Sequence, residues 1–76
     1  MKEYRVTFGQ KYDSEPHPFF NDAHPDGWVS IWAEGEEQAY EAAFTCLGLN
    51  WAFLHPAEEV SLRMYPRGEL AAVVIE

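Results

Sequence analysis

A single stretch of helical periodicity, set between shorter stretches that alternate like strands, limits this chain to a sheet with one helix. Residues 34–47 carry apolar side chains at the spacing of one buried helical stripe: Ala39, Tyr40, Ala43, Phe44 and Leu47. Glu36, Glu37 and Glu41 stand near the N-terminal end of this stretch, where the helix dipole favours negative charge. Gly48 is placed to end the helix. We therefore predict one helix over residues 34–47.

Strand-like patterns lie on both sides of this helix. Residues 2–9 and 28–33 alternate between apolar and other side chains, as half-buried strands do. Residues 49–54 form a short strand candidate that is rich in aromatic rings, and residues 56–62 fit one helical turn. Residues 69–75 are apolar on both faces, which predicts a central strand. The predicted fold is α+β: a small antiparallel or mixed sheet of about four strands, in β-β-α-β-β order, with the helix packed on one face.

The length of 76 residues gives room for one small domain over residues 1–76. Three Trp, four Tyr and five Phe supply large rings for its core, so folding without a covalent staple is expected. The single cysteine, Cys46, excludes an intramolecular disulfide and is expected to be a buried helical thiol. A lone thiol and the lack of a signal-like or membrane-spanning apolar run predict a reducing, cytoplasmic location.

The chain is strongly acidic, and its charged residues are unevenly distributed. The formal net charge is −8, and every charged residue between Lys11 and Arg63 is acidic. Binding to nucleic acid or to an anionic membrane requires lysine and arginine side chains, so neither is predicted. The acidic stretch favours a basic protein surface as partner, or imitation of DNA toward a DNA-binding enzyme, or solubility alone.

A set of short strings gives the chain a resemblance to a known group of proteins. These are residues 4–12 (YRVTFGQKY), 15–18 (EPHP), 24–28 (HPDGW), 51–54 (WAFL) and 68–70 (GEL). The pattern resembles a family of small uncharacterised proteins encoded by actinobacteria and their phages. The resemblance implies an accessory protein of a phage or its host, and it implies no site residues.

The long loop at residues 10–26 contains the candidate metal ligands. One hypothesis places a divalent metal such as zinc on His17 and His24 together with Asp22 or Glu15, because imidazole and carboxylate groups are suitable ligands. The alternative is that these rings cover the sheet edge or lie in solvent. No string in the sequence matches a nucleophile, acid–base or phosphate-binding motif, so we predict no catalytic residue, no cofactor and no enzymatic activity.

The aromatic side chains are the strongest functional candidates. If Val29 and Ile31 face the helix, Trp28 and Trp32 lie on the opposite sheet face, beside Arg5 and Thr7 of the first strand. That face is either an open interface, which could also form a homodimer, or is covered by the segment after Pro56 or by the Phe19–Phe20 pair. Tryptophan anchors are typical of protein interfaces.

The function predicted from these observations is a non-enzymatic protein–protein interaction module, with an acidic DNA mimic and a small metal-binding module as the alternatives. Its predicted partner is another protein. The expected binding residues are the two tryptophans and an adjoining surface from the long loop: Trp28, Trp32, Tyr12, His17, Phe19, Phe20 and His24.

Overall fold

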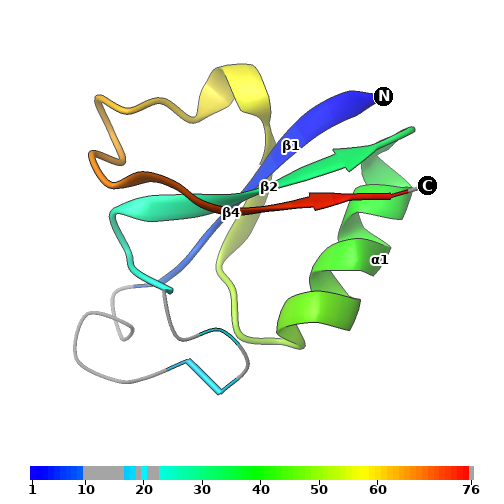
Figure 1. Cartoon of the computed structure of the whole chain (residues 1–76), viewed down its shortest axis with the longest axis horizontal. Coiled ribbons are helices and arrows are strands. Elements are labelled where there is room, and N and C mark those ends of the chain that lie inside the picture. The colour runs from blue at the N-terminus through cyan, green and yellow to red at the C-terminus, as the bar shows by residue number, and fades with distance from the viewer. Residues whose placement is uncertain (10–16, 19, 21–22, 76) are drawn as a thin grey trace.

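The computed structural model describes residues 1–9, 17, 18, 20 and 23–75. Four strands form one mixed sheet in the spatial order β3-β1-β2-β4. The strands are β1 (Lys2–Thr7), β2 (Gly27–Ala33), β3 (Phe53–Pro56) and β4 (Gly68–Val74). β1 is antiparallel to both of its neighbours, whereas β2 and β4 are parallel. The helix α1 (Glu36–Leu47) and a short 3-10 turn η2 (Ala57–Glu59) complete the fold, and the α+β prediction with one helix on a four-stranded sheet is confirmed (Figure 1).

The core lies between α1 and the sheet. Alternation in β1 and β2 directs one set of side chains to this face, and α1 contributes small residues that let its backbone approach the sheet closely. The most buried members of the core are Tyr4, Val6, Phe8, Val29, Ile31, Ala33, Ala39, Ala42, Ala43 and Leu47. The predicted helical stripe is therefore correct in phase, but Phe44 is 49% exposed. Phe44 instead meets Trp51 at the rim of the core, with ring centroids 5.4 Å apart.

Two strand predictions are corrected. β4 lies at an edge of the sheet and not in its centre. Its apolar side chains on the helix face are half-buried, whereas Ala72 and Val74 on the other face are exposed. β3 begins at Phe53 and not at Leu49, because the helix ends at Gly48 with a positive φ of 64° and the next residues turn the chain back. Pro56 falls inside β3, a position that an edge strand tolerates.

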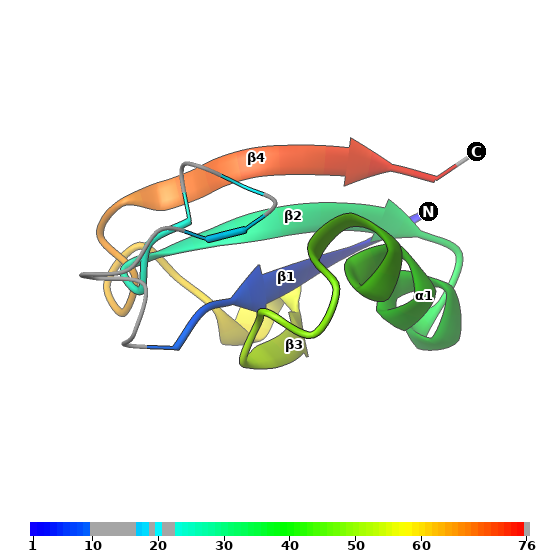
Figure 2. The ribbon, with the colours of Figure 1, turned by 90° about the horizontal axis from the view of Figure 1, so that it is seen from below.

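The connection from β3 to β4 decides which surfaces are exposed. These two strands occupy opposite edges of the sheet, so residues 57–67 must cross one of its faces. They cross the face opposite α1, as both ribbon views show (Figures 1 and 2). One face thus carries the helix, and part of the other carries this crossing segment, residues 57–67.

Candidate interaction surface

Trp28 is held in a polar network on the sheet face opposite α1. The Arg5 guanidinium carbon lies 4.4 Å from the centre of the Trp28 ring, within the range of a cation–π contact. The indole Nε1–H of Trp28 donates to Ser30 Oγ at 3.1 Å, and the Ser30 hydroxyl donates to Glu3 Oε2 at 3.0 Å. Arg5 Nε donates to the same carboxylate oxygen at 2.9 Å. The four side chains form one connected unit, so Trp28 has structural partners on its face and at its nitrogen.

The crossing segment closes over this unit. Arg5 Nη1 donates to the carbonyl oxygen of Val60, whose side chain is buried. At the end of the segment, Arg67 N–H donates to the carbonyl of Asp26 at 2.9 Å. Trp28 is consequently only 4% exposed. The predicted exposure of Trp28 as a binding anchor is corrected: the segment after Pro56 covers it, which was the alternative that the sequence left open.

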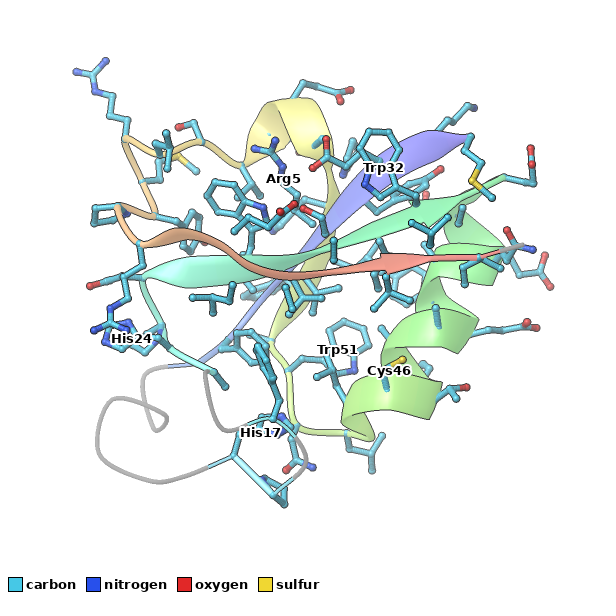
Figure 3. All side chains as sticks on the ribbon, viewed as in Figure 1. Arg5, His17, His24, Trp32, Cys46 and Trp51 are labelled. Carbon is cyan, nitrogen blue, oxygen red and sulfur yellow. The ribbon has the colours of Figure 1, made fainter. Side chains whose placement is uncertain are left out.

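Trp32 lies near the other end of β2, where it is 37% exposed. It pairs in register with Val74 of β4, which is 60% exposed, and Ala72 on the same face of β4 is also exposed. We call Trp32, Ala72 and Val74 the Trp32 patch. Figure 3 shows Trp32 on the same side of the sheet as Arg5. The patch is an exposed apolar surface on a sheet face, as the sequence predicted for one of the two tryptophans.

The long-loop residues do not adjoin the Trp32 patch where the structure describes them. His24 precedes the first residue of β2, at the opposite end of this strand from Trp32 (Figure 3). Phe20 packs against the core beside Phe8, with ring centroids 6.2 Å apart. Tyr12 and Phe19 lie outside the described residues, so their predicted role stays a prediction.

His17 is buried, at 3% exposure, and the prediction of an exposed binding residue at this position is wrong. Its Nδ1 accepts a hydrogen bond from the backbone N–H of Phe20 at 3.1 Å. Its Nε2 lies 2.7 Å from the carbonyl oxygen of Asn50, which can only accept, so the ring proton resides on Nε2. Its ring also meets Phe8 edge-on, with centroids 5.6 Å apart. These contacts hold His17 against the turn that follows α1.

In the described part of the chain, the histidines proposed as zinc ligands do not form a metal site. Both ring nitrogens of His17 contact backbone groups, and His24 Nδ1 accepts a hydrogen bond from the backbone N–H of Asp26 at 3.0 Å. Within residues 1–9, 17, 18, 20 and 23–75, no three His, Cys, Asp or Glu side chains gather closely enough to hold a metal ion. The other proposed ligands, Glu15 and Asp22, lie outside the described residues.

A groove between α1 and β4 was missed in the sequence analysis. It is lined by one face of the helix and by two residues at the end of the sheet: Gln38, Glu41, Ala42, Thr45, Cys46, Val73 and Ile75. Cys46 is exposed here, so its predicted burial is wrong. The helical spacing of positions 38, 41, 42, 45 and 46 was visible in the sequence as a second stripe, in which the last three residues are small. This stripe lines a groove only together with β4, which lies beside it in the folded protein.

Within the described residues, no helix is long and apolar enough to cross a membrane. Comparison of the chain with protein-family models, with curated proteins and with solved structures gave no match. The resemblance to small actinobacterial and phage proteins therefore stays a prediction.

Proposed function

We propose that this protein is a non-enzymatic interaction module that binds another protein, with Trp32 as its anchor. The observation that carries the proposal is the Trp32 patch: a tryptophan 37% exposed beside Val74, 60% exposed, on the sheet face opposite α1. Burying a large ring and its apolar neighbours against a partner gives a strong local contribution to affinity, and tryptophan is enriched at such positions. The crossing segment leaves this end of the face uncovered while it buries Trp28.

The charge of the protein supports a basic partner. The net charge is −8, and the exposed glutamates of the helix region include Glu34, Glu36, Glu37 and Glu41. Such a field accelerates encounter with a positive surface more than it increases final affinity. An accessory role in a phage or its actinobacterial host, in the cytoplasm, is the setting that we propose from the sequence resemblance and the single cysteine.

The test is capture of partners from an actinobacterial lysate with tagged wild-type protein and with Trp32→Ala, followed by washes at low and high salt. We expect one partner that wild type retains in high salt and that Trp32→Ala loses. Phe44→Ala is the matched control, because Phe44 is also an exposed ring, at 49%, but it lies on α1. Circular dichroism of each bait establishes that the fold is intact.

The exposed glutamates also support a second candidate, an acidic DNA mimic. This candidate predicts a DNA-binding partner that high salt releases and that added duplex DNA displaces, with no dependence on Trp32. Capture of the same partner by wild type and by Trp32→Ala in high salt contradicts the anchor role of Trp32. No enriched partner at either salt concentration contradicts the interaction proposal for that lysate.

A further inference from the structure

The two edges of the sheet differ in how well they are protected against an additional strand. β3 is an edge of only four residues that includes Pro56, and both its short length and the proline discourage pairing. β4 is an edge of seven residues whose single charged residue is Glu69, near its start, and the stretch from Leu70 to Ile75, just past its end, carries no charge and no proline. Long, apolar, uncharged edges are the ones that accept another strand. Of the two, β4 is therefore the edge suited to pairing.

The backbone of β4 has groups directed away from the sheet. Ile75 N–H donates to the carbonyl of Trp32 at 2.9 Å, so the backbone groups of Ile75 face β2. Successive residues of a strand direct these groups to alternate sides, so those of Ala72 and Val74 point outward. In the described part of the chain, no strand pairs with this outer side of β4. Two N–H and two C=O groups are thus arranged for a strand ladder.

Side-chain surfaces lie on both sides of this edge. On the helix side is the groove formed by Ala42, Thr45 and Cys46 of α1 with Val73 and Ile75. On the other side is the Trp32 patch. A strand added to β4 would direct alternate side chains into the groove and against the patch, which is how strand addition combines affinity with specificity.

The charge around the groove distinguishes between two possible occupants, a second copy of this chain and a basic segment of another protein. Gln38 and Glu41 line the groove, and they also line a neighbouring surface that contains Glu34 and Glu37. A second copy of this chain, paired through its own β4, would bring a second set of these glutamates to the same interface. Lysine or arginine from a partner would instead pair with them.

We infer that the outer edge of β4 binds an extended segment of the partner protein as a fifth strand, with apolar side chains toward Ala42 and Cys46 and a lysine or arginine toward Glu41. This inference rests on the proposed function, and it specifies the chemistry of the partner and the mode of binding. The Trp32 patch then contacts the opposite side chains of the same segment.

The probe is the peptide acetyl-Lys-Thr-Val-Thr-Val-Thr-Lys-amide, whose symmetric pattern fits β4 in either direction. Its alternate face presents two valines between two lysines. We expect peptide titration to shift the NMR signals of Val73, Ile75 and Cys46 and to slow amide exchange at Ala72 and Val74. The same peptide with glutamate in place of lysine should bind at least about fivefold more weakly, which corresponds to about 1 kcal/mol.

Two variants of the protein separate the backbone contribution from the charge contribution. Ala72→Pro removes an outward N–H without removing a bond to β2, and it should abolish peptide binding while the far-ultraviolet spectrum is unchanged. Glu41→Lys should weaken binding of the lysine peptide at least about fivefold. Its matched control, Glu59→Lys, makes the same charge change at an exposed position on η2 and should leave binding within about twofold.

Three outcomes would overturn the inference. They are no peptide binding by the wild-type protein, binding that folded Ala72→Pro retains, and concentration-dependent protection of Ala72 and Val74 without peptide, which would identify a second copy as the occupant. If the peptide fails while Trp32-dependent capture of a partner persists, strand addition is wrong and the proposed function stands. If Trp32 dependence fails, the proposed function is contradicted independently.

Discussion

The guanidinium group of Arg5 stacks on the ring of Trp28, 4.4 Å from its centroid, and at the same time donates to the carbonyl of Val60 in the crossing segment. One side chain of β1 therefore connects β2 to the segment that covers it. Glu3 accepts from both Arg5 and Ser30, which holds the guanidinium in position. This arrangement explains why one tryptophan of β2 is structural while the other remains exposed.

Replacing Arg5 should destabilise the protein. Arg5→Ala removes the ring contact and two hydrogen bonds and leaves the half-buried Glu3 carboxylate without its cation, so we expect a loss of about 2–3 kcal/mol in the free energy of unfolding. Arg5→Lys keeps the charge but lacks the planar fork, and it should lose about half as much. Urea denaturation measures both values. A loss below about 0.5 kcal/mol for Arg5→Ala would contradict the connecting role.

The two tryptophans of β2 should respond differently to truncation. Trp28 is only 4% exposed, so Trp28→Ala empties a buried site. It should lower the free energy of unfolding by about 3–5 kcal/mol. Trp32→Ala should cost less than about 2 kcal/mol, because part of this ring is already in solvent. Urea denaturation followed by circular dichroism avoids the change in fluorescence that each substitution causes. Equal losses for the two variants would refute the assignment of different roles.

Gly68 directly follows the crossing segment, and this position should not tolerate a side chain. Its φ is +70°, and a Cβ atom there would lie 2.9 Å from Leu62 Cδ2. Gly68→Ala should therefore lose about 1–3 kcal/mol through backbone strain and displacement of Leu62. Gly9→Ala is the control, because a Cβ at Gly9 meets nothing within 4 Å, and its stability should change by less than about 0.5 kcal/mol. Thermal unfolding of the pair distinguishes a specific effect from a general one.

The neutral imidazole of His17 should carry its proton on Nε2. Long-range ¹⁵N–¹H correlation spectra at neutral pH should show Nδ1 unprotonated, because Phe20 N–H donates to it. His17→Ala should lose about 1–3 kcal/mol, since it leaves the Asn50 carbonyl and the Phe20 amide without this partner. His24→Ala, at a half-buried position, should lose less. A proton found on Nδ1 would contradict the hydrogen-bond assignment.

Cys46 should react in the native state. Because the thiol is exposed on the groove side of α1, a colourimetric disulfide reagent should titrate one thiol per chain without denaturant. The rate should be within about tenfold of that of the urea-unfolded protein at the same pH. Reaction only after unfolding would show that α1 is rotated about its axis relative to the described orientation.

Much of the fold could be predicted because its patterns are local. The alternation of Tyr4, Val6 and Phe8 and the helical stripe containing Ala39, Ala43 and Leu47 record which side of each element is buried. The predicted position of Trp28 and Trp32 opposite the helix follows from the same alternation, and the contact of Arg5 with Trp28 agrees with it. Each of these inferences needs only residues a few positions apart.

The candidate site was predicted in part, because exposure depends on distant segments. Nothing near Trp28 or Trp32 in the sequence indicates that Val60 and its neighbours cover one and not the other. Likewise, the buried contacts of His17 are made with Asn50, which is far along the chain. The groove beside Cys46 exists only because β4 is placed next to β2.

The sequence by itself determined the number and type of the main elements, the buried side of each, and the acidity of the surface, since periodicity and charge are properties of short stretches. The tertiary structure alone decided that β4 is an edge, that residues 57–67 cross the second face, and that Trp32 is left in solvent while Trp28 is enclosed. The physical reason is that strand order and coverage are set by competition among long-range contacts. An apolar stretch such as Leu70–Ile75 satisfies a central or an edge position equally well until its neighbours are placed.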